Sequence, residues 1–99
     1  MNNVTNTAIS GLQTAQLRLN ASANNVANAQ TDGYRRDVVR AQPQANGGVQ
    51  AQVEKLPEPG SDLAADLVEQ KSAAYAFKAN VQVIKTADET LGRLLDVRA

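Results

Sequence analysis

Residues 61–99, SDLAADLVEQKSAAYAFKANVQVIKTADETLGRLLDVRA, decide the fold because they predict one long helix. Apolar side chains recur along this stretch at alternating steps of four and three residues, the spacing of the a and d positions in a heptad repeat. Pro59 and Gly60 end any preceding element, and Ser61 or Asp62 can cap the first turn. The predicted seam consists of Leu63, Leu67, Gln70, Ala74, Phe77, Val81, Ile84, Asp88, Leu91 and Leu95.

The predicted helix is too long for the rest of the chain to cover in a compact domain. At roughly 1.5 Å per residue it extends about 55 Å. Polar residues such as Gln70 and Asp88 are tolerated in a coiled-coil seam and can fix its register. The helix therefore needs partners along most of its length.

A second helix is predicted from Thr5 to about Ala29, again with steps of four and three. Its seam is mostly small, so it complements the larger side chains of residues 61–99 and allows close approach of the two backbones. The segment between them is short enough to return the chain, which predicts an antiparallel pair. This seam contains Ala8, Leu12, Ala15, Leu19, Ser22, Val26 and Ala29, and we expect Leu12, Leu19 and Val26 to meet Phe77, Ile84 and Leu91.

The N-terminal segment carries almost no charge. About half of residues 1–31 are Asn, Gln, Ser or Thr, and Arg18 is the single charged residue. Uncharged polar groups cost less to desolvate than charges, so we interpret this surface as made for protein neighbours. We expect residues 1–30 to become stably helical only when neighbours cover them. The alternative is a poorly helical, loose N-terminus.

The middle of the chain predicts a turn and a small hairpin. Asp32-Gly33 favours a turn with positive φ at Gly33 that folds Tyr34 back beside the helices. Residues 34–41 and 49–53 predict two strands joined across residues 43–48, with residues 46–48 as the turn. Residues 55–60 read as an extended linker. We expect the hairpin to lie on the first turns of the C-terminal helix, around Leu63, Leu67 and Val68.

Composition excludes several classes of function. Ten basic and ten acidic residues cancel, which argues against nucleic acid or an anionic membrane as a partner. No apolar run could span a bilayer, and the start lacks the pattern of a cleaved signal peptide. The chain has neither cysteine nor histidine, so thiolate chemistry and the common zinc ligand sets are absent.

Charged pairs on the predicted C-terminal helix give no sign of an enzyme. Acidic residues pair at Asp66/Glu69 and Asp88/Glu89, but solvated helix faces carry such pairs constantly. The repeat of Lys71, Lys78 and Lys85 is typical of residues that flank a coiled-coil seam. We therefore predict no catalytic residue, no metal site and no cofactor.

Two groups of motifs resemble those of the bacterial flagellar rod and hook axial proteins. Residues 8–16 (AISGLQTAQ), 23–28 (ANNVAN) and 31–36 (TDGYRR) resemble the N-terminal signature of that family. The C-terminal signature is matched, in the order and spacing of the family, by Tyr75, residues 79–80 (AN), 83–84 (VI), 86–89 (TADE), 91–92 (LG) and 94–96 (LLD).

The resemblance implies a structural subunit of the basal-body rod. Family members place both termini in a coiled-coil domain that packs into a helical axial tube, and they are exported through the flagellar type III apparatus without a cleaved signal peptide. The implied partners are copies of the chain and related axial proteins, and the implied location is the periplasmic rod of the basal body. Many members insert β domains between the motifs, so this chain is similar to a short rod-type member.

We thus predict a mainly α fold with an antiparallel coiled-coil helix pair and a small β-hairpin between the helices. The expected units are residues 1–30, 31–60 and 61–99. A soluble helical accessory module for export or assembly is the alternative to a built-in subunit. The residues predicted to pair the helices or to serve assembly are Leu12, Leu19, Val26, Asn24, Asn25, Asn28, Gly33, Tyr34, Tyr75, Phe77, Asn80, Val81, Ile84, Asp88, Leu91 and Leu95.

Overall fold

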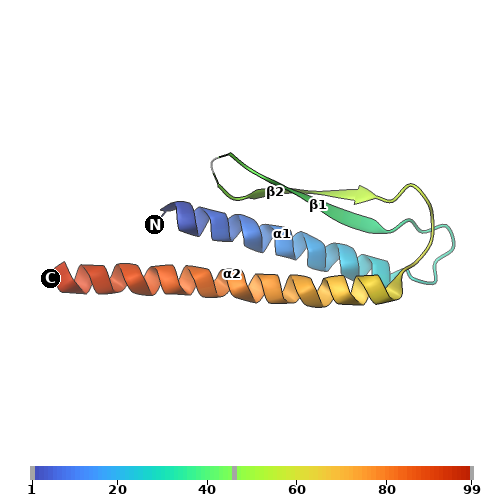
Figure 1. Cartoon of the computed structure of the whole chain (residues 1–99). Helices are drawn as coiled ribbons and strands as arrows, with labels where there is room; N and C mark the ends of the chain where they lie inside the picture. Colours follow the sequence, from blue (N-terminus) through green and yellow to red (C-terminus); the bar gives the residue numbers. More distant parts are fainter. Residues whose placement is uncertain (1, 46, 99) are drawn as a thin grey trace.

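The chain forms two long antiparallel helices with a two-stranded hairpin beside them (Figure 1). The computed structural model describes residues 2–45 and 47–98. Its elements are α1 (Asn2–Ala27), β1 (Asp37–Pro43), β2 (Val49–Lys55) and α2 (Leu63–Arg98). The molecule is elongated, with extents of 63 × 25 × 13 Å. The predicted fold class, a mainly helical pair with a small intervening hairpin, is confirmed.

Small side chains form the buried centre of the contact between α1 and α2. On α1 the buried positions include Ala8, Ala15 and Ser22, and on α2 they include Ala73 and Ala87. Without larger groups between them, the two backbones approach closely. The larger side chains flank this line and are half-buried, namely Leu12, Leu19, Val26, Phe77 and Ile84.

The register of the seam on α2 differs from the prediction. The residues turned toward α1 are Asp66, Gln70, Ala73, Phe77, Asn80, Ile84 and Ala87. Gln70, Phe77 and Ile84 belong to the predicted seam, but each alternate position lies one residue earlier than predicted. The line that faces α1 is therefore rotated by about 50° around the helix. Leu67, Val81 and Asp88 are consequently exposed. At the exchanged positions, the polar Asp66 and Asn80 replace Leu67 and Val81, and the small Ala87 replaces Asp88.

Gly11 marks the point of close approach near the middle of α1. A Cβ atom built there would lie 2.6–2.8 Å from the amide group of Asn80. That amide is held in place because its Nδ2 donates to the carbonyl of Ala76 at 2.8 Å. Gly11 therefore provides room for the Asn80 side chain between the helices.

We expect Gly11→Ala to lower the free energy of unfolding by about 1–3 kcal/mol, because the new methyl group overpacks against Asn80. Gly92→Ala is the matched control, since nothing lies within 4 Å of a Cβ at Gly92. It should raise stability by up to about 1 kcal/mol through helix propensity alone. Urea unfolding of both variants measures the difference. If Asn80→Ala fails to restore stability to Gly11→Ala, the clash is not the cause.

The hairpin pairs β1 with β2 in a continuous antiparallel register from Asp37 opposite Lys55 to Pro43 opposite Val49. β1 begins and ends later than the predicted residues 34–41, because residues 34–36 form the connection from α1. β2 begins at Val49, as predicted, and ends two residues later than residue 53. Gly47 and Gly48 have positive φ in the turn, as hairpin turns require. Asn46, the first residue of the predicted turn at residues 46–48, lies outside the described residues.

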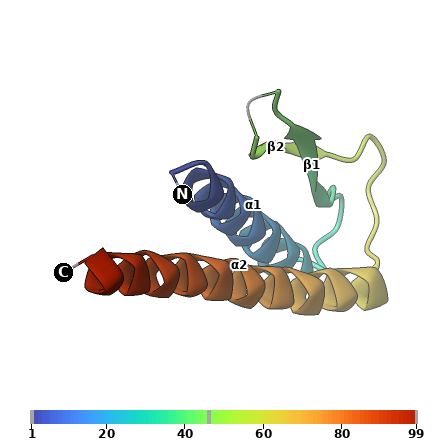
Figure 2. The ribbon, with the colours of Figure 1, turned by 60° about the vertical axis from the view of Figure 1, so that its left-hand side comes forward.

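The strands pack on α1 and, within the described part of the chain, not on α2 (Figure 2). Ser10 ties the hairpin to α1, since its Oγ accepts a hydrogen bond from the backbone N–H of Val49 at 3.0 Å. The prediction that the hairpin lies on Leu63, Leu67 and Val68 is wrong, and all three are exposed. The hairpin instead covers a second face of α1.

The extra length of α2 lies at its C-terminal end, where it extends past the start of α1 (Figure 1). Asn25 in the last turns of α1 contacts Asp66 in the first turn of α2, so these ends of the helices are level. The turns of α2 that have no part of α1 beside them therefore lie at its end and not at its beginning (Figure 1). Asp62 caps α2, as its Oδ1 accepts from the backbone N–H of Ala65 at 3.1 Å.

The predicted conformation of Gly33 is confirmed, with φ of 74°. No atom lies within 4 Å of a Cβ built there. A substitution therefore has a conformational cost and no steric clash with neighbours. Tyr34 folds back onto α1, where its hydroxyl lies 3.2 Å from Oδ1 of Asn25.

We expect Gly33→Val to lower the free energy of unfolding by about 1–2 kcal/mol, the cost of the left-handed region for a residue with a Cβ. Gly33→Asn should lose less, because asparagine visits this region more readily. Thermal unfolding followed by circular dichroism compares the two. Equal stability of Gly33→Val and the parent chain would contradict this role of the turn.

Candidate functional site

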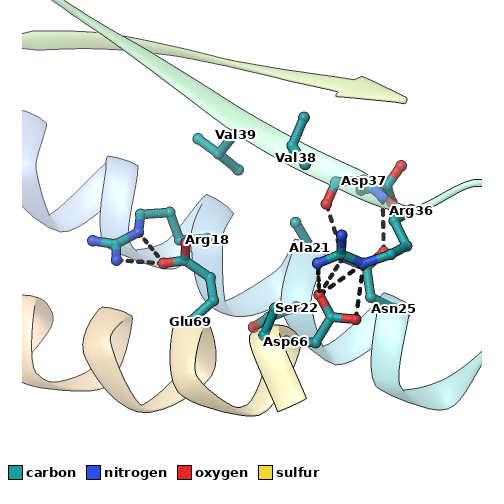
Figure 3. Close-up of a pocket in the computed structure, with 11 residues that line it drawn as sticks. Arg18, Ala21, Ser22, Asn25, Arg36, Asp37, Val38, Val39, Asp66 and Glu69 are labelled. Carbon is teal, nitrogen blue, oxygen red and sulfur yellow. Dashed lines mark hydrogen bonds and ion pairs between the residues drawn. The ribbon is translucent and has the colours of Figure 1, made fainter. Parts of the chain in front are cut away.

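The candidate site is a polar junction where α1, α2 and the start of the hairpin meet (Figure 3). Asp66 is only 1% exposed and lies in the first turn of α2. The guanidinium of Arg36 pairs with it: Nε donates to Oδ1 at 3.2 Å and to Oδ2 at 3.1 Å, and Nη2 also donates to Oδ1. This bidentate pair joins the segment before β1 to α2.

Asn25 connects α1 to Asp66 and to Asp37, the first residue of β1. Its Nδ2 donates to Oδ1 of Asp66 at 3.2 Å and to the backbone carbonyl of Asp37 at 2.8 Å. The backbone N–H of Asp37 donates in turn to Oδ1 of Asn25 at 2.8 Å. The Asn25 amide thus binds Asp37 as a neighbouring strand would, and it fixes the first residue of β1 on α1.

Tyr34 and Lys55 form the outer layer of the junction. Nζ of Lys55 donates to Oδ1 of Asp37 at 2.8 Å and lies 4.7 Å from the centre of the Tyr34 ring. Burial and the nearby Asp37 carboxylate raise the pKa of the Tyr34 hydroxyl, since both disfavour its ionised form. Hydrogen bonding to Asp66 raises the pKa of Arg36, which stays charged.

A cavity of about 160 Å³ lies beside this network. Arg18 closes one side, donating from Nε to Glu69 and from Nη2 to Oγ of Ser72 at 3.0 Å. Each carboxylate of the site is paired with a cation, so no free acid or base faces the cavity. Within the described residues, no group of three or more potential ligands could hold a metal ion. This network of polar contacts holds α1, α2 and the start of β1 together.

The structure places the predicted assembly residues in three locations. At the helix contact, Asn80 is half-buried along with the flanking aliphatic and phenyl side chains. At the junction, Asn25 is buried, Tyr34 is half-buried, and Asn28 accepts from Thr31 below the last turn of α1. The exposed positions are Asn24, Tyr75, Val81, Asp88, Leu91 and Leu95.

Neither member of the buried ion pair was predicted from the sequence. The interpretation of Asp66 as part of a solvated acidic pair with Glu69 is wrong, because Asp66 is buried against Arg36 and Glu69 contacts Arg18. Glu69 therefore contacts α1, and Asp66 contacts the segment that connects α1 to β1. No spacing rule links Arg36 to Asp66, thirty positions apart. The only feature of the sequence that pointed to this pair was the run Tyr34-Arg35-Arg36 directly after the turn at Gly33.

An apolar surface lies at the opposite end of the molecule. Val4 of α1 and Val83, Ala87 and Thr90 of α2 line a shallow groove there. The α2 seam continues beyond this groove without α1 to cover it. Its last apolar members are Leu91, Leu94 and Leu95, which are 44%, 56% and 60% exposed.

Comparison with known proteins identifies the N-terminal part of the chain. The family model described as flagella basal body rod protein matches residues 6–35, which comprise most of α1, the Gly33 turn and the first residue of the arginine pair. No curated protein matches the chain. Within the described residues, no helix is long and apolar enough to cross a membrane. The predicted resemblance is therefore confirmed: residues 6–35 are similar to the flagella basal body rod proteins, a structural family and not an enzyme family.

Proposed function

We propose that this protein is a subunit of the flagellar rod whose terminal helices assemble into a helical axial tube. Its similarity to rod proteins supports a structural role at the basal body. The observation that carries the assembly step is the apolar end of α2. Leu91, Leu94 and Leu95 continue the seam past the start of α1, where no other part of the described chain covers them.

Burial of this apolar surface against a neighbouring protein is more favourable than its exposure to water. Burying one leucine fully contributes about 1.5–3 kcal/mol, so three adjacent leucines offer a substantial part of an interface. The neighbours are copies of this chain or related axial proteins. The C-terminal resemblance at residues 75–96 supports the same role, because it covers this exposed end.

We propose the periplasmic rod as the location and the flagellar type III apparatus as the export route. The resemblance to the axial proteins, whose members are exported through this apparatus, supports this route, and residues 6–35 carry that resemblance. A reporter fused behind residues 1–35 and a strain lacking the export apparatus would test it. Secretion that persists in that strain would exclude the route.

The assembly proposal is tested in isolated hook–basal bodies. A built-in subunit should remain in the particles after washing at high salt and with detergent. An accessory module, the alternative function, should wash off while a known axial component stays. Its appearance only in the wash would overturn the rod-subunit proposal in favour of the accessory.

A further inference from the structure

The two halves of α1 differ in how strongly their residues favour a helix. In the first half, residues 2–14, ten of the thirteen residues are Asn, Thr, Ser, Gly, Val or Ile, which are weaker helix formers than Ala or Leu. In the second half, residues 15–27, eight are Ala, Leu, Gln or Arg, which favour a helix. The sequence of the first turn contains no acidic residue to stabilise the helix dipole. The first half of α1 therefore depends on contacts with other parts of the fold.

The hairpin holds the two halves of α1 at different points. At its base, the amide of Asn25 makes two hydrogen bonds of 2.8 Å with the backbone of Asp37, and these fix the second half. At the hairpin tip, residues 43–45 and 47–49, the backbone N–H of Val49 donates to Oγ of Ser10 in the first half at 3.0 Å. Within the described part of the chain, no other side-chain hydrogen bond joins α1 to the tip.

The contact between the tip and α1 is close at one point and open around it. A Cβ atom built at Gly48 would lie 2.9 Å from Oγ of Ser10, so the tip approaches α1 closely there. Beside this point, a hollow of about 320 Å³ lies between the tip and α1. Ala41 and Pro43, on the same face of the hairpin as Val49, remain exposed. The tip is thus held at one point and not by broad apolar packing.

We propose that the hairpin tip is a latch that keeps the first half of α1 helical. While Ser10 binds Val49, the tip and α2 cover two faces of this half. When the latch opens, the first half loses one of these covers, and its weak helix formers unfold locally. The second half stays helical, because the junction holds it through Asn25.

Opening of the latch would change the surface that α2 presents. Gly11 lies against Asn80, and Val4 lines the groove at Ala87, so the first half of α1 covers this part of the seam. Its local unfolding would uncover the seam from Asn80 to Ala87 and extend the apolar surface that begins at Leu91. The inference goes beyond the proposed function. Its tests use the isolated chain, so their failure would leave the rod-subunit proposal standing.

Ser10→Ala removes the acceptor of the latch. Alanine is the better helix former, so propensity alone predicts slower hydrogen exchange of the amides of residues 8–14. The latch predicts the opposite: these amides should exchange at least about twofold faster than in the parent chain, because one hydrogen bond is lost. The amides of residues 19–26 should keep their rates and serve as an internal reference. NMR of the isolated full chain resolves the two groups. Exchange of residues 8–14 at or below the parent rate would overturn the inference.

Thr14→Val is the matched control for this substitution. Oγ1 of Thr14 donates to the backbone carbonyl of Ser10 at 2.9 Å, a hydrogen bond within α1. Valine keeps the shape of the side chain and has a similar helix propensity, so the exchange of residues 8–14 should stay at the parent rate. Equal acceleration by Ser10→Ala and Thr14→Val would overturn the latch. Acceleration along the whole of α1 would also overturn it, because it would indicate a global loss of stability.

Ser10→Cys combined with Gly48→Cys closes the latch covalently. A Cβ at Gly48 would lie 3.5 Å from Cβ of Ser10, a separation that a disulfide spans. The chain contains no other cysteine. The oxidised and reduced forms have the same sequence, so the conformational cost of the positive φ at position 48 is common to both.

We expect the amides of residues 8–14 to exchange at least about twofold more slowly in the oxidised form than in the reduced form, since a covalent bond replaces the hydrogen bond that opens. Equal exchange in the two forms would show that the order of the first half does not depend on the tip. Failure of the disulfide to form would overturn the inference as well, because Ser10 and the tip would then not be in contact in solution.

Discussion

Arg36→Gln should lower the free energy of unfolding by about 3–5 kcal/mol, the usual cost of removing one member of a buried ion pair. Asp66 is 1% exposed and would lose its bidentate partner, so its charge would remain in the interior. The amide of Asn25 alone cannot compensate for this charge. Urea unfolding followed by far-UV circular dichroism measures the loss.

Arg35→Gln provides the matched control for this substitution. Arg35 is adjacent and exposed, and only its backbone carbonyl is used, accepting from Lys55. Its replacement should change stability by less than about 0.5 kcal/mol. The double variant Arg36→Met with Asp66→Leu should be more stable than Arg36→Met alone, because it leaves no buried charge. If the double variant is instead less stable than Arg36→Met, the unpaired Asp66 is not the source of the loss.

Leu91→Asp should abolish motility while leaving the isolated protein folded. Leu91 is 44% exposed and lies on the α2 seam beyond the cover of α1. An aspartate there costs the free helix at most about 0.7 kcal/mol in propensity. In an assembled interface, however, the same charge would be desolvated without a partner, which costs several kcal/mol. Swimming assays and the amount of the variant in isolated basal bodies measure the effect.

Arg93→Asp serves as the control for the apolar end. Arg93 lies on the same turns of α2 but about 200° around the helix from Leu91. Its substitution changes the charge by more than Leu91→Asp does, yet it should permit motility. Normal motility of Leu91→Asp at a normal protein level would contradict a role of this surface in assembly.

The sequence was sufficient to predict the elements and their order. Strict steps of four and three defined both helices, Pro59 and Gly60 marked the start of α2, and Gly33 required a turn with positive φ. These features are local, because they depend on periodicity and on the conformational limits of single residues. The helical pair and the hairpin could therefore be derived without tertiary contacts.

The facing side of α2 could not be derived in the same way. Two overlapping seams share Gln70, Phe77 and Ile84. Their alternate positions are Leu67, Ala74, Val81 and Asp88 in the predicted seam and Asp66, Ala73, Asn80 and Ala87 in the observed one. The apolar Leu67 and Val81 favour the first set. Close approach to Ala15 and Gly11 on α1 favours the second, and the structure adopts it. Side-chain size at an interface is meaningful only when the opposing surface is known.

The position of the hairpin and the role of the junction were likewise decided by tertiary structure. Asn25, Arg36 and Asp66 come from three separate segments, and nothing in their spacing indicates that they meet. Their contact sets α1 level with the start of α2, which leaves Leu91, Leu94 and Leu95 beyond the start of α1. Periodicity and turn chemistry are encoded over a few neighbouring residues, so the sequence alone determined the helices and the Gly33 turn. The facing surfaces depend on polar pairing and close packing between distant segments, which only the folded chain brings together.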